Sequence, residues 1–182
     1  MTTIILYGDE KEKRLGKILF NTLSNIGNIN YFNTKEIICN NKKLTKKNFV
    51  LYEISDLENL DCKNCIFIFK NSFKIFNENL IKKNVVPIFA TPNSCAANIL
   101  SSANQPAITC GTSVKNTLSI AGTTGENIAI SLQRYIKNLN GQTIEPQDFT
   151  IKLSKEIPLP FLLITGAVLL LTQENHITEY NI

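Results

Sequence analysis

The sequence predicts an α/β protein with a mostly parallel sheet flanked by helices and an antiparallel, strand-rich C-terminal part. In the first two thirds of the 182-residue chain, apolar runs of strand length alternate with helical segments. Strands joined by helical crossovers form parallel sheets. After Gly111 the pattern changes to short apolar runs separated by turns, which is typical of antiparallel hairpins. The length predicts a single domain over residues 1–182.

From the N-terminus, TIILYG is a short apolar run that predicts a strand. Residues 10–26 carry apolar side chains at i, i+3 and i+4 spacing, which predicts a helix with one buried face. We expect Asp9 and Glu10 to start this helix, because the helix dipole favours negative charge there. NINYF, NFVLYEIS and CIFIFKN are predicted strands, and the near-continuous apolarity of the second indicates burial on both faces. A helix is expected at residues 72–82.

VVPIFAT and PAITCG are the next predicted strands, and a helix is expected between them at 94–103 with Ser94 as its N-cap. The C-terminal part is predicted to form strands at NTLSIAG, NIAISLQR, YIKNL, QTIE and DFTIKL, with turns such as TTGE and LNGQ. The apolar stretch 157–171 is shorter than the roughly 20 residues that span a bilayer. Two prolines at its start and Gly166 within it favour a buried core helix over membrane insertion.

The charge pattern argues against a nucleic-acid surface. The net charge of +4 is spread thinly over the chain. The segments KEKR and NNKKLTKK are short and contain no interleaved aromatic residues, so we interpret them as a solvated helix face and a solvated loop. The first apolar run is too short for a signal peptide, so we expect a cytoplasmic protein.

Cys62 and Cys65 have the spacing of half a zinc site. Structural zinc takes four ligands, usually from two such pairs, and the sequence contains no second pair of this kind. The favoured interpretation is that Cys65 packs as a small apolar side chain, and a redox pair or a metal site is the alternative. We expect no metal and no cofactor. The single histidine, His176, lies near the end of the chain, which argues against hydrolases that need a histidine base.

The stretch IILYGDEKEKRLGKIL has the layout of a phosphate-binding loop, in which an apolar strand ends at Gly8 and a charged helix follows. A working P-loop has the pattern G-x-x-x-x-G-K-[ST]. Here the next glycine is Gly16, and Ile18 stands after Lys17 where the hydroxyl residue is needed. Asp9 and its neighbouring glutamate would also repel a phosphate. The sequence therefore predicts the geometry of a phosphate loop without its chemistry.

Several blocks in order resemble the central domain of the Mur ligases, ATP-dependent enzymes that add amino acids to peptidoglycan precursors. IILYGDEKEKRLGKILFNTLSNIG has that family's strand, loop and helix, with Gly8 and Gly27 in matching places. VLYEISD is similar to a Glu–Val–Ser type motif, which puts Glu53 at the position of a glutamate that helps hold magnesium. CIFIFKN, with Asn71, is similar to a strand that ends in Thr–Asn. PIFATPNSCAANIL and AITCGTSVKNTLSIAG resemble the strand–turn–helix and the strand that follow in the family.

The departures from the family concentrate at the chemistry. The P-loop glycine, lysine and threonine are replaced, and Ser55 and Asp56 follow Glu53 where the family has a nearby histidine. No Gly–His–Asn motif occurs near residues 154–162. We expect neither the UDP-binding domain nor the substrate amino-acid domain of the family. The resemblance therefore implies a bacterial protein with a P-loop-NTPase-like core, a degenerate P-loop and no catalysis.

We therefore predict a non-catalytic domain that binds a protein partner, a second copy of itself or a small ligand. The alternative is a nucleotide-binding protein or small enzyme with an altered site around Gly8, Lys11, Lys13 and Glu53, at the strand ends where open α/β sheets bind ligands. For Glu53, an ion pair with a lysine or a helix cap is the favoured interpretation. A membrane-surface protein is a further alternative, and it requires residues 158–171 to be exposed.

Arg134 is a candidate ligand-binding residue, because guanidinium groups bind carboxylates and phosphates bidentately. A structural ion pair of Arg134 with Glu145 or Asp148 is the favoured interpretation. The segment 111–115 contains Gly, Thr, Ser and Lys, a composition that suits a small anion nest. An ordinary turn is the favoured interpretation of that segment.

Overall fold

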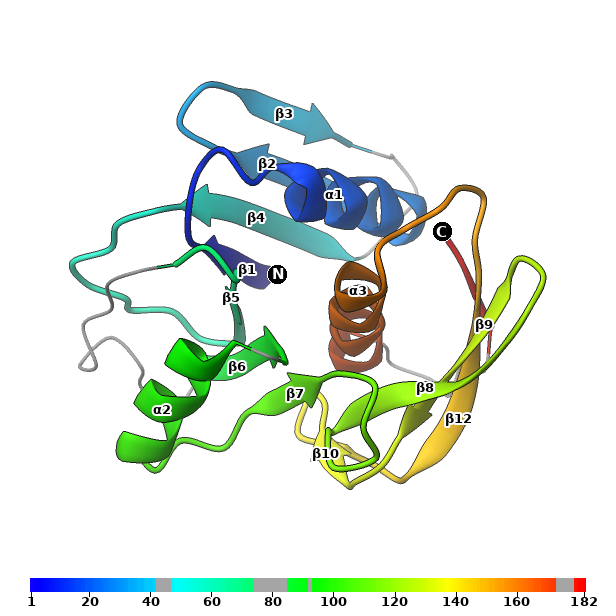
Figure 1. Cartoon of the computed structure of the whole chain (residues 1–182). Coiled ribbons are helices and arrows are strands. Elements are labelled where there is room, and N and C mark those ends of the chain that lie inside the picture. The colour runs from blue at the N-terminus through cyan, green and yellow to red at the C-terminus, as the bar shows by residue number, and fades with distance from the viewer. Residues whose placement is uncertain (42–46, 74–84, 92, 173–178) are drawn as a thin grey trace. The chain divides into compact units, whose positions relative to one another are not determined.

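The computed structural model divides the chain into two compact units. Unit 1 comprises Met1–Phe89 and Asn93–Ala107, and unit 2 comprises Ala90–Pro92 and Ile108–Ile182. The structure describes residues 1–41, 47–73, 85–91, 93–172 and 179–182. Mixed strands and helices build both units (Figure 1), so the predicted α/β class is confirmed. A single domain over 1–182 stays a prediction.

The sheet of unit 1 has the strand order β6-β5-β1-β4-β2-β3. Its strands are β1 (Thr2–Tyr7), β2 (Asn28–Phe32), β3 (Ile37–Asn40), β4 (Asn48–Ile54), β5 (Cys65–Phe69) and β6 (Val85–Ala90). The paired strands are parallel except for β3, which pairs antiparallel with β2. The parallel sheet predicted from the apolar runs is therefore confirmed. β3 was not predicted, and its Ile37 is largely exposed.

Helix α1 (Arg14–Ile26) packs on β2 and β4, as Figure 1 shows. Its buried side chains recur at helical spacing and include Leu15, Leu19 and Leu23, so the predicted apolar face is confirmed. The expected start of the helix at residue 10 is wrong, because residues 9–12 form a hydrogen-bonded loop instead. The expected role of Asp9 and Glu10 at the helix start is wrong for the same reason, since the first turn contains no acidic residue.

Helix α2 (Ser94–Ser102) covers the other face of the unit 1 sheet, where its Ala96 and Leu100 join an aromatic cluster from β1, β5 and β6. The predicted cap at Ser94 is wrong by one residue. Asn93 is the N-cap, and its side-chain oxygen accepts a hydrogen bond from the backbone N–H of Ala96 at 3.0 Å. The Asn93 amide also donates to the carbonyl of Lys70 at 3.1 Å, which ties the start of α2 to the end of β5. Most of the helix expected at 72–82 lies outside the described residues.

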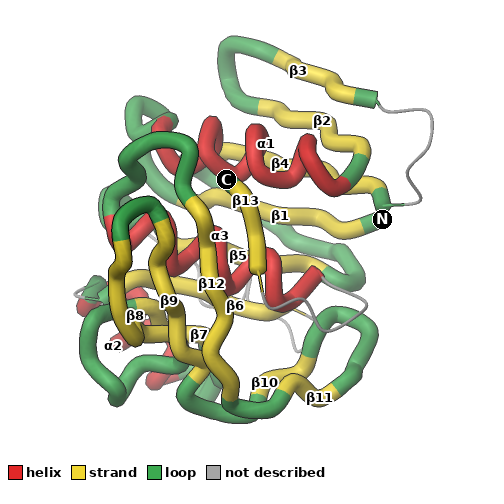
Figure 2. The backbone as a smooth tube through the Cα atoms, turned by 90° about the vertical axis from the view of Figure 1, so that its right-hand side faces the viewer, coloured by secondary structure: helices red, strands yellow, loops and turns green. Residues whose placement is uncertain are grey.

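The strands of unit 2 confirm the predicted antiparallel C-terminal part. They are β7 (Ile108–Cys110), β8 (Leu118–Thr124), β9 (Asn127–Leu132), β10 (Ile136–Lys137), β11 (Thr143–Ile144), β12 (Gln147–Lys152) and β13 (Glu179–Asn181). β9 pairs antiparallel with β8 and with β12, and Figure 2 shows these strands side by side. The predicted turns TTGE and LNGQ each place a glycine at positive φ, Gly125 at 58° and Gly141 at 81°. β13, parallel to β12, was not predicted.

Helix α3 (Leu159–Thr172) is the predicted core helix, and its side chains from Leu162 to Leu171 are buried. Gly166 allows α3 to pack closely on β9 and β12 within unit 2, because an added Cβ would lie 3.2 Å from Ile130 and 3.3 Å from Phe149. The exposure that a membrane-surface protein requires of this segment is not found. Among the described residues, no helix combines the length and the apolar character that crossing a membrane demands.

Candidate functional site

A pocket of ≈ 390 Å³ lies in unit 1 where β1, β4 and β5 end. β4 and β5 follow each other along the chain yet pair with opposite edges of β1, so β1 is a topological switch point. Open α/β sheets bind ligands in the crevice at the carboxyl ends of such strands. The pocket is lined by Tyr7, Gly8, Asp9, Ser55, Asp56, Ser72 and Phe73. Its position and its size are those of an ordinary small-molecule site.

Gly8 turns the chain sharply out of β1. Its φ is +150°, and an added Cβ would lie 2.8 Å from the Cβ of Lys70. Glycine adopts positive φ without steric cost, so the turn and the close approach both require glycine here. The backbone N–H of Gly8 donates to the carbonyl of Ile54 at 3.0 Å, which joins the loop after β1 to the end of β4.

The backbone N–H groups of Asp9, Lys11 and Glu12, which follow Gly8, are already hydrogen-bonded within the chain. The N–H of Asp9 donates to the Ser72 hydroxyl at 3.1 Å, and the N–H of Lys11 donates to the Asp9 carboxylate at 2.8 Å. The N–H of Glu12 donates to the carbonyl of Asp9 at 3.1 Å. A P-loop leaves such N–H groups free to cradle phosphate. This loop uses them to hold its own shape.

A buried ion pair lies beneath the loop. Lys70 Nζ is 2.6 Å from Glu53 Oε1, and both side chains are 0% exposed. Glu53 is the penultimate residue of β4, and Lys70 directly follows β5. Lys70 Nζ also donates to the carbonyl of Asp9 at 2.9 Å, so the same ammonium group fixes the loop. The ion pair of Glu53 with a lysine, favoured from the sequence, is confirmed.

Tyr31 and Gly16 complete the surroundings of Glu53. The Tyr31 hydroxyl donates to Glu53 Oε2. Burial, together with the nearby Glu53 carboxylate, raises the pKa of Tyr31, so the phenol stays a donor at neutral pH. A Cβ on Gly16 would lie 2.8 Å from the Tyr31 hydroxyl and 2.9 Å from Glu53 Oε2. A glycine in the first turns of α1 therefore lets the helix backbone close over the buried carboxylate.

The outer side of the loop is held by a second carboxylate. Glu10 accepts hydrogen bonds from the hydroxyls of Ser55 at 2.8 Å and Thr34 at 2.9 Å. These two hydrogen bonds, with Ser55 the larger cause, lower the pKa of Glu10 below its ordinary value of 4.5. The loop after β1 is therefore tied to the segments that follow β2 and β4.

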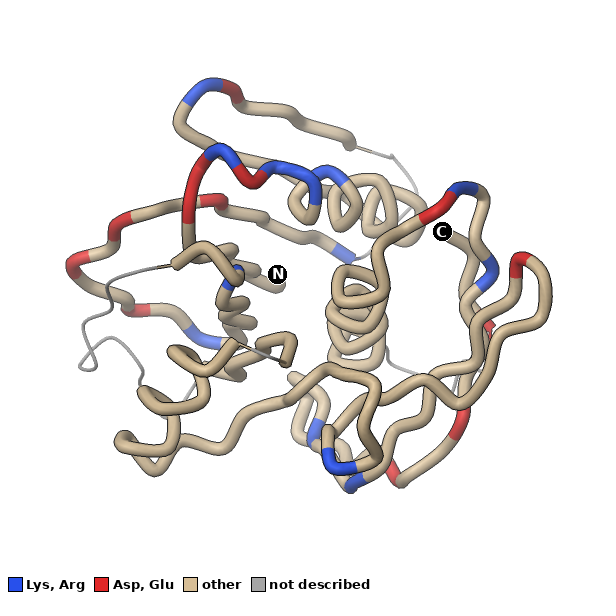
Figure 3. Tube along the Cα trace, in the orientation of Figure 1, with Lys and Arg blue, Asp and Glu red and all other residues tan. Residues whose placement is uncertain are grey.

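The pocket itself is acidic. Asp9 and Asp56 line it, and neither forms an ion pair with a lysine or arginine of the described residues. Burial raises the pKa of Tyr7, and the negative charge of Asp56 adds to that shift. Figure 3 shows acidic residues in both segments that follow β1 and β4. An anion in the pocket would face these carboxylates.

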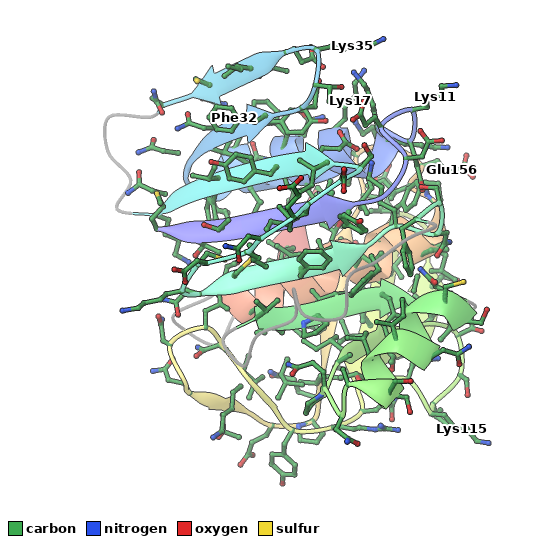
Figure 4. All side chains as sticks on the ribbon, turned by 90° about the vertical axis from the view of Figure 1, so that its left-hand side faces the viewer. Lys11, Lys17, Phe32, Lys35, Lys115 and Glu156 are labelled. Carbon is green, nitrogen blue, oxygen red and sulfur yellow. The ribbon has the colours of Figure 1, made fainter. Side chains whose placement is uncertain are left out.

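The structure separates the sequence-predicted site residues. Gly8 lines the pocket, whereas Glu53 is buried beneath the loop. Lys11 points away from unit 1 at its periphery (Figure 4). Lys13 forms a partly exposed ion pair with Glu36 at 3.8 Å. These four residues do not converge on one ligand position, and their binding role stays a prediction.

Arg134 belongs to unit 2, whereas the other four candidate residues belong to unit 1. The ion pair of Arg134 with Glu145 or Asp148 is wrong, because its guanidinium donates to the carbonyl of Lys115 at 2.5 Å. That carbonyl lies in the 111–115 segment, which forms an ordinary turn. The N–H of Lys115 donates there to the Ser113 hydroxyl at 3.2 Å.

The cysteines and the histidine add no metal centre within the described residues. All five cysteines are free thiols, and Cys65 is buried, as favoured from the sequence. No three Cys, His, Asp or Glu side chains gather in the described part of the chain. His176 lies outside the described residues.

Two central residues of this site escaped the sequence analysis. A lysine after a strand is ordinarily solvated, so Lys70 gave no signal by itself, although strand alternation puts it on the face of Ile66 and Ile68. Gly16 was judged only as a P-loop glycine, whereas a glycine inside an apolar helix face also indicates close packing.

In comparisons with protein-family models and with curated proteins, nothing matches this chain. The fold and the site define an α/β protein in which a buried lysine holds the loop after β1. The charge of that lysine, Lys70, is neutralised by the buried Glu53. The resemblance to the Mur ligase central domain stays a prediction from the sequence.

Proposed function

We propose that this protein is a non-catalytic binding domain with a Mur-ligase-like core, which holds a small ligand in the pocket at the ends of β1, β4 and β5. The Glu53–Lys70 pair is the observation that supports a non-catalytic role, because it occupies the carboxylate that the resemblance assigns to magnesium binding. The resemblance equates Glu53 with a glutamate that helps hold magnesium. Here Glu53 Oε1 is 2.6 Å from the Lys70 ammonium, and Oε2 accepts from Tyr31. A fully buried carboxylate with both oxygens engaged is not available to a metal ion.

The charges of the pocket favour a positively charged ligand. Asp9 and Asp56 line it, and the N–H groups of Asp9 and Lys11 are already bonded. The Lys70 ammonium beneath the loop is neutralised by Glu53. A nucleotide triphosphate would meet repulsion there. An amine would gain attraction from the two carboxylates and from the ring of Phe73, since aromatic faces attract cations. We therefore assign the ligand to small organic amines.

The nucleotide-binding alternative needs the loop to open and Lys70 to leave Glu53. A protein partner or a homodimer remains the alternative for a pocket that binds no small molecule. The bacterial cytoplasm is the setting we propose, on the strength of the Mur ligase resemblance.

Thermal unfolding with added ligand tests this function. A ligand that binds only the native state raises the unfolding midpoint in a concentration-dependent way. We expect agmatine or spermidine to raise it and Mg-ATP to leave it unchanged. Asp56→Asn should abolish the shift, whereas Asp61→Asn, which changes an exposed acid that does not line the pocket, should keep it.

The other outcomes separate the alternatives. A midpoint raised by Mg-ATP and not by amines would favour the altered nucleotide site and contradict the proposed ligand class. No shift with any of these compounds at millimolar concentration would contradict a small-ligand pocket and leave a protein partner as the function to test.

A further inference from the structure

The segment Asp61–Cys65 brings two thiols together at the start of β5. Cys62 is half-buried in the preceding loop, and Cys65 is the fully buried first residue of the strand. The chain bends at residues 63 and 64, and Asn64 has a left-handed φ of 55°. This conformation is uncommon for residues other than glycine, and asparagine tolerates it best. The bend returns Cys62 toward Cys65, so that both side chains contact the same apolar cluster. Burial raises the pKa of the Cys65 thiol, and the neighbouring Cys62 thiol adds to that shift.

The surroundings of the two thiols are apolar. Cys65 belongs to the cluster that contains Phe67 and Leu60, and Cys62 packs against that same cluster. A disulfide has no S–H group and suits an apolar environment at least as well as two thiols. Asn64 is fixed from outside the segment, because its carbonyl accepts a hydrogen bond from the N–H of Thr3 at 3.4 Å. The bend is therefore part of the sheet and not of a free loop.

We propose that Cys62 and Cys65 form a reversible disulfide by exchange with a small-molecule disulfide such as oxidised glutathione. This site is independent of the proposed pocket function. The half-buried Cys62 is the thiol that an oxidant can reach, and the fully buried Cys65 is the thiol that resolves the product. Burial also raises the pKa of the Cys65 thiol, which agrees with Cys62, and not Cys65, being the thiol that first attacks the small disulfide.

The exchange balances in two steps. The Cys62 thiolate attacks one sulfur of the small disulfide, that S–S bond breaks, and one thiolate leaves and takes up a proton. The Cys65 sulfur, after losing its proton to water, attacks the Cys62 sulfur of the mixed disulfide and releases the second small thiolate. Two protein thiols are thereby oxidised, and one small disulfide is reduced to two thiols. A small-molecule thiol in excess reverses both steps.

Peptide mapping of the full-length chain tests the disulfide. Trypsin cleaves after Lys63, which lies between the two cysteines, so an oxidised pair would join two tryptic peptides that are otherwise separate. The folded chain would be treated with oxidised glutathione, blocked with iodoacetamide and digested without reductant. We expect the peptides that end at Lys63 and at Lys70 to be joined, and dithiothreitol to separate them.

The remaining exposed thiols serve as internal controls. Cys39 on β3 and Cys95 on α2 are exposed, so we expect each to carry a glutathione adduct. Cys65→Ser should trap the glutathione on Cys62, and Cys62→Ser should leave Cys65 unmodified. Circular dichroism would establish that both variants fold. The peptide map of the unmutated chain shows whether the Cys62–Cys65 disulfide forms, even if a variant fails to fold.

Two results would overturn this inference. One is a Cys62 that keeps its glutathione in the unmutated chain while Cys65 stays a free thiol. The other is a pair that remains fully reduced while Cys39 and Cys95 are modified, since the reagent would then have reached the protein without oxidising the pair.

Discussion

Replacing Lys70 by methionine should destabilise unit 1 strongly, because the change leaves Glu53 as an unpaired carboxylate. The two side chains form a 2.6 Å ion pair with no exposed surface. Methionine has similar length and adds no polar group, so the substitution removes the charge and the hydrogen bond to Asp9 with little change in volume. Breaking one partner of a buried pair costs about 3–5 kcal/mol in the free energy of unfolding.

The double variant Glu53→Gln/Lys70→Met separates the two contributions to that loss. Glutamine keeps an oxygen that can accept from Tyr31, and no charge is left buried. Removing both members of a buried pair is often nearly neutral. We therefore expect the double variant to recover at least about 2 kcal/mol of the loss in Lys70→Met, which is within the range of coupling between contacting residues.

Urea unfolding at pH 7 measures these free energies. Far-UV circular dichroism is the suitable signal, since the chain contains no tryptophan. Lys13→Met is the matched control, because Lys13 and Glu36 form a partly exposed pair at 3.8 Å that should contribute under about 1 kcal/mol. A loss in Lys70→Met no larger than in Lys13→Met would refute a stabilising role of the buried pair. A loss in the double variant equal to the sum of the losses in Lys70→Met and in Glu53→Gln alone would also refute it, because the two residues would then be uncoupled.

Two further changes follow from the geometry. The lowered pKa of Glu10 gives stability that is full above its ordinary value of 4.5 and is lost as pH falls through the lowered value. Thermal midpoints of Glu10→Gln and the unmutated protein should therefore differ at pH 7 and converge in acid; a constant difference would contradict this linkage. Gly111→Ala should cost about 1–3 kcal/mol, because its Cβ would overlap the Thr91 hydroxyl and the Asn116 amide, whereas Gly122→Ala meets nothing within 4 Å and should change urea unfolding little. Equal effects of the two alanines would contradict this account of the packing.

The sequence predicted the strands that are buried along their length. TIILYG, CIFIFKN and VVPIFAT are apolar runs bounded by polar residues, and such runs have few other stable conformations in a folded chain. β3 and β13 were missed because they are short edge strands, and their pairing depends on a neighbour that the local sequence does not specify. Ile37 of β3 is mostly exposed, so this strand shows no alternation of buried and exposed residues.

The start of α1 shows why local preference failed. Asp9 and Glu10 suit a helix N-terminus, yet the Glu10 carboxylate and the Asp9 backbone N–H both bind partners that are distant in sequence. Glu10 accepts from Ser55 and Thr34, and the N–H of Asp9 donates to Ser72, 63 residues away. These contacts exist only when β1, β4 and β5 are adjacent. These tertiary hydrogen bonds therefore hold residues 9–12 in a loop conformation, and the helix begins only at Arg14.

The sequence predicted the turn after the first strand, but it did not predict the charges around that turn. Gly8 at the end of an apolar strand marks where the chain must turn, and the resemblance put Glu53 at the end of a neighbouring strand. The charge state of the site depends on Lys70, which reaches Glu53 only through the register of β4, β1 and β5. No spacing in the sequence encodes that contact, so the sequence favoured a lysine or a helix end as the partner of Glu53 without identifying Lys70.

The buried pair links the stability of this protein to what it can bind. The Lys70 ammonium neutralises Glu53 and also donates to the Asp9 carbonyl at 2.9 Å. The side chain that stabilises the carboxyl ends of β4 and β5 therefore also keeps the loop closed. A phosphate could recruit this ammonium only by leaving Glu53 charged in a site without solvent, at a cost of several kcal/mol. The carboxylates of Asp9 and Asp56 remain at the pocket surface, where they can attract a cation without disturbing the pair. The proposed amine ligand is therefore compatible with the folded loop, whereas we expect a nucleotide to compete with the Glu53–Lys70 pair.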